Sequence, residues 1–287
     1  MLVWGESIKM SDYPRRIVCL TEETTETLYL LGEQDRIVGV SGYTARPPEA
    51  RLKPKVSAFT SAKVDKIVEL APDLVLAFSD LQAEIVRQLL TRGLTVFAFN
   101  QRSVTEILEM VETLARIIGK PEKGTILVKQ LRSGLDDIAK SAQRFPFRPR
   151  VFFEEWNEPL ISGIEWVEEL VEIAGGQPVF PELRKKSAAK DRMVDPAVVA
   201  ARNPEVVIAS WCGRKVTKKC IYERAGWNRV SAIGEKRVYE VKSTYILQPG
   251  PAALTEGVRQ LHAIIAKVVH CPLEATLVPV APLDAAL

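Results

Sequence analysis

The clearest pattern in the chain is a short helix followed by an apolar strand, and it occurs twice. Residues 64–77 read VDKIVELAPDLVLA, and residues 194–209 read VDPAVVAARNPEVVIA. In each copy, apolar residues at helical spacing end at Pro72 or Pro204, and an apolar run follows. The two prolines are 204 − 72 = 132 residues apart, close to half of the 287-residue chain. The pattern therefore predicts two similar lobes, with a ligand-binding cleft between them.

The first lobe is predicted to alternate short apolar strands with amphipathic helices. Strands are expected at 17–20, 37–40, 56–57, 74–78 and 95–99, and helices at 24–31, 64–71, 82–91 and 104–118. Gly32 and Gly93 follow two of these helices, where glycine is favoured as a terminator. This β-α order is typical of a mainly parallel sheet with helices on its faces.

A long helix is predicted at 121–142, with leucines at positions 127, 131 and 135 along one side. At 1.5 Å per residue it would span about 30 Å, so it would act as a rigid strut between the lobes. The second lobe is expected to contain strands at 150–154, 206–210 and 238–241, and helices at 165–174, 194–203, 221–233 and 251–269.

The predicted fold class is therefore α/β, with two lobes of mainly parallel sheets flanked by helices and joined by one long backbone helix. The expected boundaries are an N-terminal α/β lobe at 14–119, the backbone helix at 120–143, a C-terminal α/β lobe at 149–270 and an undocked tail at 271–287.

Composition excludes some classes of partner. The net charge of +3 is spread without a basic stripe, which argues against nucleic acid, and no apolar run reaches the length of a membrane span. The first residues lack the pattern of a secretion signal, so we expect a periplasmic protein if a signal has been removed, and otherwise a cytoplasmic one. A monomer is expected.

The sequence contains no common catalytic motif. The only histidines, His262 and His270, are expected to serve packing or to lie on the surface, and Cys19 to be a buried, inert thiol. Cys212 and Cys220 could form a disulfide in an oxidising compartment, although their spacing does not fix the geometry.

Aromatic and polar residues gather directly after the predicted strands, where open α/β sheets bind ligands. The expected ligand contacts are Tyr43, Phe59, Ser61, Phe78 and Asn100 in the first lobe, and Glu154, Glu155, Trp156, Trp211, Cys212, Tyr245 and Gln248 in the second. Phe78 could equally belong to the core of its lobe.

Two acidic pairs and one basic segment leave alternatives open. Glu22-Glu23 and Glu154-Glu155 could be metal or acid–base pairs, but solvated acids or acids at a helix N-terminus are commoner. The basic residues of 185–192 are typical of a solvated charge run, with an anion contact as the alternative. No metal site is assigned.

Several segments, 16–18, 38–43, 56–59, 67–78 and 175–176, resemble those of a known family. This is the family of substrate-binding proteins of cobalamin, siderophore and haem importers, and the similarity is greatest to its cobalamin-binding members. The resemblance implies two lobes joined by one rigid helix and an ABC permease as partner.

The resemblance also implies roles for particular residues. Tyr43, Phe59, Phe78 and Trp156 match or lie near the aromatic residues that clamp the flat ligand. One docking carboxylate per lobe is expected. Asp65 matches the first, while Ala197 stands at the second position and Asp195 lies two residues away.

The sequence therefore favours a non-enzymatic binding protein for a metal-containing or metal-chelating small molecule, with a cobalamin-type corrinoid as ligand rather than catalytic cofactor. A siderophore or haem protein is the alternative within the class, with Tyr245 or Arg192 directed at iron or carboxylates. The alternative of another class is an enzyme with Cys212 as nucleophile or a glutamate pair holding a metal.

Overall fold

The computed structural model describes residues 13–272, which form two compact units. Unit 1 comprises residues 13–100 and 112–125, and unit 2 comprises 101–111 and 126–272. Helices α4 (Val104–Ile117) and α5 (Pro121–Ala142) therefore have residues in both units. The predicted tail lies outside the described residues from position 273 onwards. Of the described helices, none has the length and apolar character needed to cross a bilayer.

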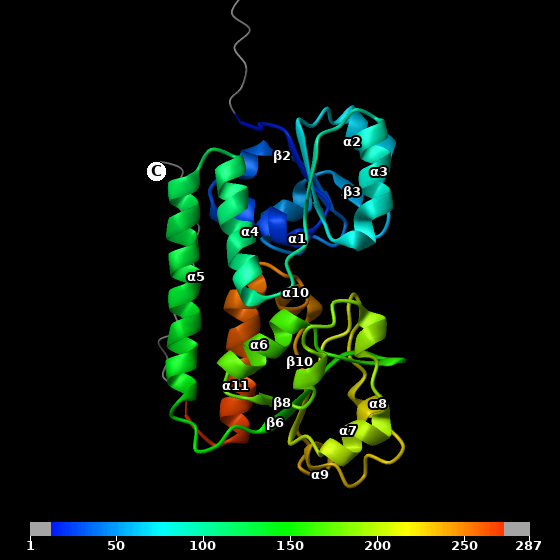
Figure 1. The fold of residues 1–287 in the computed structure, drawn as a ribbon, viewed down its shortest axis with the longest axis vertical. Helices are drawn as coiled ribbons and strands as arrows, with labels where there is room; N and C mark the ends of the chain where they lie inside the picture. Colours follow the sequence, from blue (N-terminus) through cyan, green and yellow to red (C-terminus); the bar gives the residue numbers. More distant parts are fainter. Residues whose placement is uncertain (1–12, 273–287) are drawn as a thin grey trace, which may run out of the picture. The chain divides into compact units, whose positions relative to one another are not determined.

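Unit 1 contains a five-stranded parallel sheet with the strand order β3-β2-β1-β4-β5. Its strands are β1 (Ile17–Cys19), β2 (Ile37–Ser41), β3 (Lys55–Ser57), β4 (Leu74–Phe78) and β5 (Val96–Phe99). Its helices are α1 (Glu22–Leu30), α2 (Val64–Glu69) and α3 (Ala83–Thr91). Figure 1 shows α2 and α3 along one face of this sheet and α1 on the other. The central strands are fully buried because helices cover both faces, which explains their continuous apolar runs.

Unit 2 contains a mainly parallel five-stranded sheet in the order β10-β9-β6-β7, with β8 also paired to β6. Its strands are β6 (Arg150–Asn157), β7 (Leu160–Ser162), β8 (Gln177–Pro178), β9 (Val206–Ala209) and β10 (Val238–Glu240). Its helices are α6 (Glu165–Ile173), α7 (Pro196–Arg202), α8 (Lys218–Tyr222), α9 (Ser231–Gly234), α10 (Ser243–Ile246) and α11 (Val258–Val268). Only the β6–β7 hairpin is antiparallel. Sequence analysis missed β7 and β8, which are three and two residues long.

Short 3₁₀ turns complete the two units, at Gln34–Arg36, Pro48–Leu52, Asp80–Gln82, Pro181–Leu183 and Ala189–Arg192.

The sequence repeat corresponds to equivalent structure in the two units. Helix α2 leads into β4 and helix α7 into β9, as predicted. Each helix is followed by a non-glycine residue in the left-handed region, Ala71 with φ of 43° and Asn203 with φ of 45°. These two residues are also 203 − 71 = 132 positions apart, and each directly precedes the proline of its repeat. The left-handed residue reverses the chain, and the proline prevents the helix from continuing.

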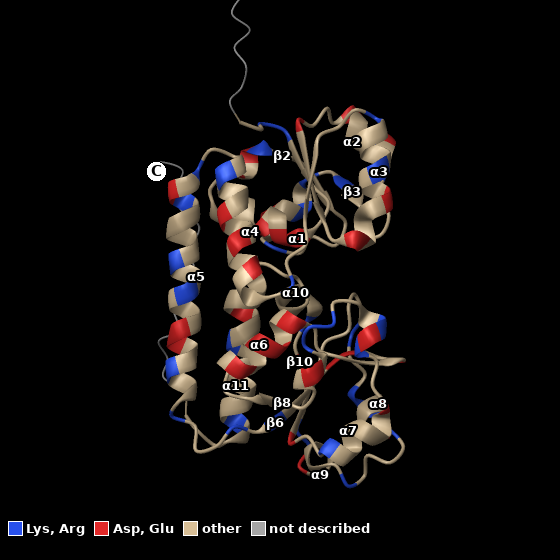
Figure 2. Ribbon diagram, in the orientation of Figure 1, with Lys and Arg blue, Asp and Glu red and all other residues tan. Residues whose placement is uncertain are grey.

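Helix α5 has the predicted bounds, and the predicted α/β fold class with one long connecting helix is confirmed. Its apolar line is buried, since Leu127 and Leu131 have no exposed surface. Both acidic and basic residues lie along the helix (Figure 2).

One predicted helix of unit 2 is wrong in detail, and another contains a π-helical stretch. The stretch 221–233 is not one helix, because Gly226 adopts a φ of 79° and separates α8 from α9. Trp227 then turns into the core, where its Nε1 donates to the Pro196 carbonyl oxygen at 2.9 Å. The last helix is π-helical over Ala253–Gly257 before α11 begins. There Gly257 packs directly against the Tyr245 carbonyl group, leaving no room for a side chain.

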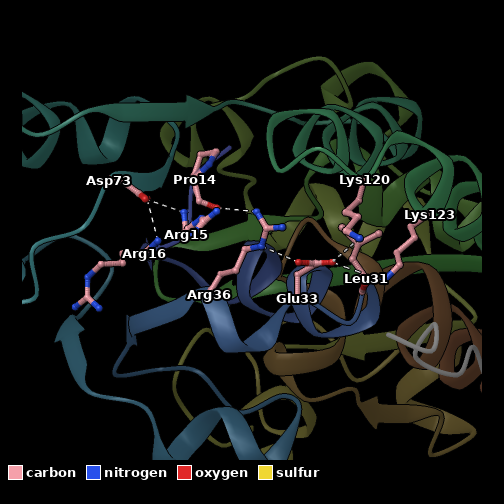
Figure 3. Close-up of polar contacts among 9 residues, drawn as sticks. All are labelled: Pro14, Arg15, Arg16, Leu31, Glu33, Arg36, Asp73, Lys120 and Lys123. Atoms are coloured by element: carbon pink, nitrogen blue, oxygen red, sulfur yellow. Dashed lines mark hydrogen bonds and ion pairs between the residues drawn. The ribbon is translucent and has the colours of Figure 1, made fainter. Parts of the chain in front are cut away.

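The start of α5 is anchored within unit 1 by a charge network around Glu33 (Figure 3). Lys123 is almost fully buried, and its Nζ donates to the Leu31 carbonyl oxygen at 3.1 Å and lies 3.6 Å from Glu33 Oε1. Arg36 Nε donates to Glu33 Oε2 at 2.7 Å, and Lys120 Nζ lies 3.8 Å from Glu33 Oε1. Three cations thus share one carboxylate, which compensates the burial of Lys123.

In unit 2, helix α6 carries four glutamates, visible as its acidic positions in Figure 2. Glu168 is 3% exposed, and its Oε2 has no hydrogen-bond partner. Burial raises the pKa of Glu168 to about 8, although Arg184 and Arg192 oppose this rise and Glu172 and Glu155 add to it. The protonated form of Glu168 is therefore the one that the folded protein favours near neutral pH.

We predict that Glu168 makes unit 2 less stable as the pH rises. The pKa is higher in the folded state than its ordinary value of 4.5, so the folded state binds more protons between about pH 4.5 and 8. Stability from this group is therefore lost across that window, by at most about 1.4 kcal/mol per pH unit. Glu168→Gln should flatten the fall in melting temperature between pH 5.5 and 8.5.

Glu235→Gln is the control, because that residue is exposed and is not one of the groups that shift the pKa of Glu168, so the slope should stay unchanged. A Glu168→Gln protein that is less stable than the wild type at pH 8.5 would show instead that Glu168 is ionised and paired with the arginines.

Candidate functional site

The strands of unit 1 are all parallel, so the segments that follow β2, β3 and β4 leave the sheet on the same side. This side contains the carboxyl ends of the strands, and we call it the carboxyl edge. Tyr43 follows β2 and is 56% exposed, with its amide held by the Ser41 hydroxyl at 3.1 Å. Phe59 follows β3, is half-buried and has a φ of 50°. Phe78 ends β4 and is buried, with its ring centroid 6.5 Å from that of Phe59. The structure thus brings Phe59 and Phe78 together at the carboxyl edge.

Gln82 holds these two aromatic segments in place, and sequence analysis missed it. Its Nε2 donates to the Phe59 carbonyl oxygen at 2.7 Å, and its Oε1 accepts from the Phe78 amide at 2.9 Å. Gln82 has no exposed surface, so these bonds form away from competing water. A glutamine after a predicted strand gives no sign in the sequence that it will bridge two loops.

The other expected contacts of unit 1 are exposed near the same edge. Ser61 closes a turn after β3, in which the amide of Ala58 donates to the Ser61 carbonyl oxygen at 2.8 Å. Asn100 follows β5 directly and is exposed. Both lie at the position in the fold that the sequence analysis assigned to them.

At the carboxyl edge of unit 2, β6 and β9 bring two tryptophans together. The ring centroids of Trp156 and Trp211 are 6.5 Å apart, with Trp156 half-buried and Trp211 only 1% exposed. Trp211 Nε1 donates to Glu154 Oε1 at 3.2 Å.

Glu154 and Trp211, which were expected to contact the ligand, are both buried. Glu154 has no exposed surface and accepts two hydrogen bonds from the Arg224 guanidinium, at 2.8 and 3.1 Å. Burial raises the pKa of Glu154, and the bonds from Arg224 and Trp211 oppose that rise. This forked pair fixes the Glu154 carboxylate, which in turn holds the Trp211 indole near the Trp156 ring.

The second glutamate of this strand, Glu155, is also paired with an arginine. Glu155 accepts from both terminal nitrogens of Arg192, at 2.6 and 3.0 Å. Arg192 is 1% exposed, so the expectation that it belongs to a solvated run or points at a ligand is wrong. Glu154 and Glu155 therefore serve as partners of arginines, and no group of three or more metal-binding side chains occurs within residues 13–272.

The first acidic pair lies at the start of α1, as the helix-terminus interpretation predicted. Glu22 and Glu23 are both buried, and burial raises their pKa values to about 7 and about 8. Glu23 accepts a short hydrogen bond from the Thr21 hydroxyl.

The cysteines and histidines follow the packing interpretation in most respects. Cys19 is buried, which raises the pKa of its thiol to about 12, and His262 is buried against the Phe145 ring at 5.0 Å. Cys212 and Cys220 are both exposed, and the possible disulfide between them is not formed.

Two further expected contacts, Tyr245 and Gln248, flank the end of α10 in unit 2. Both are half-buried. The segment after them is tied to the start of α4 by Gln101, whose Nε2 donates to the Pro249 carbonyl oxygen at 2.9 Å.

The two expected docking carboxylates lie at the starts of the repeated helices. Asp65, in the first turn of α2, is 82% exposed and pairs with Arg92 at 2.7 Å. Asp195 caps α7, and its Oδ1 accepts from the Ala197 amide at 2.7 Å. Both are surface acids outside the aromatic edges.

Comparisons with known proteins agree with this architecture. Residues 17–245 match the periplasmic binding protein family. The chain is 30% identical, over 271 residues, to the uncharacterized ABC transporter substrate-binding lipoprotein YvrC of Bacillus subtilis (strain 168), covering 90% of this chain and 82% of that one. It is 26% identical to the vitamin B12-binding protein of Vibrio parahaemolyticus, covering 92% of each.

Two solved structures share the fold. The periplasmic vitamin B12 binding protein BtuF of Vibrio cholerae superposes with a TM-score of 0.70 at 23% identity, covering 89% of this chain and 98% of that one. The periplasmic heme-binding protein RhuT of Roseiflexus sp. RS-1 superposes with a TM-score of 0.75 at 20% identity, covering 89% and 99%.

The family match spans most of the chain, and the observed sheets and connecting helix agree with it. The protein therefore belongs to the periplasmic binding protein family, as a non-enzymatic substrate-binding protein of the ABC-transporter type.

Proposed function

We propose that the protein binds a cobalamin-type corrinoid and delivers it to an ABC importer outside the cytoplasmic membrane. The observation that carries this proposal is the aromatic surface at the carboxyl edge of unit 1, where Tyr43 and Phe59 expose ring surface beside Phe78. Aromatic rings suit a large, flat ligand because burial of apolar surface contributes about 25 cal/mol per Å². The similarity to a vitamin B12-binding protein over almost the whole chain supports the same ligand.

The edge of unit 2 supplies a second aromatic surface of the same kind. Trp156 is half-buried, and its Nε1 donates to the Glu158 carbonyl oxygen at 3.0 Å, which fixes the plane of the indole. A ring held in this way loses little side-chain entropy when it contacts a ligand.

A haem-type ligand is the second candidate, and Tyr43 is the observation that favours it. A tyrosine oxygen can coordinate ferric haem iron, and Tyr43 is the exposed tyrosine of this edge. His262 is unsuited to that role because its two ring nitrogens contact the Ala174 carbonyl oxygen and the Ser141 hydroxyl.

We predict that cyanocobalamin forms a one-to-one complex of submicromolar Kd, about 8 kcal/mol or tighter, and quenches tryptophan fluorescence through Trp156. Tyr43→Ala should weaken binding by about 1 to 3 kcal/mol because it removes a ring face, whereas Tyr43→Phe should leave the Kd nearly unchanged. Phe147→Ala, at an exposed ring outside both edges, is the control.

Parallel titrations with haem separate the two candidates. If haem binds more tightly than cyanocobalamin, and Tyr43→Phe abolishes the haem absorption shift, the ligand is haem and the corrinoid proposal fails. Binding of neither compound at about 100 μM would contradict both candidates.

We further propose that Asp65 and Asp195 dock the protein onto the permease. Asp65 lies in the first turn of α2, whereas Asp195 caps the equivalent helix α7, two residues before the position that matches Asp65, and both are exposed. Paired surface acids of this kind would steer association with basic surfaces on a permease.

Asp65→Arg should reduce co-purification with the cognate permease at least tenfold while leaving the cyanocobalamin Kd unchanged. The matched control is Glu84→Arg, because Glu84 is also exposed and pairs with an arginine at 2.7 Å. Equal losses in the two variants, or a tenfold weaker ligand Kd in Asp65→Arg, would remove Asp65 from the docking surface.

A further inference from the structure

A basic turn leaves the carboxyl end of β9, directly beside the tryptophans of unit 2. We define it as residues 212–219, which read CGRKVTKK and contain two arginine or lysine pairs. Gly213 adopts a φ of 67°, and the Arg214 amide donates back to the Trp211 carbonyl oxygen at 3.1 Å. This tight reversal sets Arg214 close to the Trp211 ring, with the guanidinium carbon 5.9 Å from the ring centroid.

Two contacts tie the basic turn to the neighbouring strand. The Val216 amide donates to Glu240 Oε1, at the end of β10, at 3.2 Å. The Gly213 amide donates to the Ser243 hydroxyl at 3.4 Å. The turn is therefore held along the carboxyl ends of β9 and β10, where ligands of parallel sheets bind.

The positive charge of the basic turn is largely uncompensated. Arg214, Lys215, Lys218 and Lys219 are all exposed. Lys219 lies 3.8 Å from Glu223, whereas the other three have no carboxylate within 4.0 Å in the described part of the chain. Three cations without a carboxylate partner among the described residues therefore lie within the five residues 214–218, at the carboxyl ends of β9 and β10.

The arginines around β6 differ from this turn in the same unit. Arg192 and Arg224 are each engaged by a glutamate in a forked pair and serve the fold. The cations of the basic turn make no such pairs, although Lys218 Nζ lies 5.9 Å from the Tyr239 ring centroid. Arg214, with a planar guanidinium near an aromatic ring, suits a carboxylate or phosphate on a flat ligand.

We propose that the basic turn binds a carboxylate group of the transported ligand, so that the protein prefers metal chelates with free carboxylates over the matching amides or esters. This inference rests on the proposed function. It adds that the ligand bound at the carboxyl edge of unit 2 carries negative charge. The aromatic rings hold the flat part of the ligand, and Arg214, Lys215 and Lys218 pair with its charged substituent.

The test compares matched ligands that differ in charge. Cyanocobalamin is titrated beside its derivative with side-chain amides hydrolysed to carboxylates, and haem beside haem dimethyl ester. The wild type should bind the anionic member of a pair about tenfold more tightly at low salt, and the preference should shrink as salt rises. The variant R214Q/K215Q/K218Q should lose the preference and keep its affinity for the neutral member.

The matched control is K129Q/R132Q/K140Q, which removes the same charge from exposed positions of α5. It should retain the preference, which separates a local contact from the loss of net charge. Thermal melts of both triple variants confirm that they fold.

The outcomes distinguish this inference from the proposed function. Ligand binding without any charge preference contradicts the inference alone, and absence of binding by all four compounds contradicts both. If the turn variant keeps the preference but loses binding to phosphatidylglycerol vesicles, relative to phosphatidylcholine vesicles, then the basic turn serves a membrane surface and the inference is overturned.

Discussion

The parallel pairing of strands is the constraint on which the rest of this structure depends. In unit 1 all five strands run in one direction, so the segments after β2, β3 and β4 must leave at the same edge. This brings Tyr43, Phe59 and Phe78 to one side of the sheet, although up to 35 residues separate them in sequence. The same pairing of β6, β9 and β10 gathers Trp156, Trp211 and the basic turn in unit 2. Binding residues can therefore change without disturbing the strands that place them.

Buried polar side chains then fix the geometry of each edge. Gln82 joins the segments of Phe59 and Phe78 through two backbone contacts, and Arg224 holds Glu154, which accepts from the Trp211 indole. Such contacts are costly to break in the interior, because each would leave a polar group without a partner. They define a rigid edge that presents aromatic rings without large rearrangement.

The strands and helices were largely predictable because each carries its own periodic signal. Helix α5 was predicted with its observed bounds, since Gly119 and Pro121 mark its start and its leucines recur at helical spacing. The 221–233 stretch misled the analysis because its apolar residues continue past Gly226, where the backbone turns. Burial of Trp211 was not predictable from its small and polar neighbours. Its indole bonds to Glu154, which Arg224 reaches from 70 residues away in the sequence.

The central claim is that the carboxyl edges of the sheets contact a corrinoid ligand. Hydrogen–deuterium exchange with and without saturating cyanocobalamin tests it most directly, because it locates the contact as well as detecting it. The account predicts slower amide exchange at 42–44, 58–61 and 78–82 in unit 1 and at 155–157 in unit 2, with unchanged exchange in α3. Protection confined to α2 and α3, or no protection at any of these segments under saturation, would contradict it.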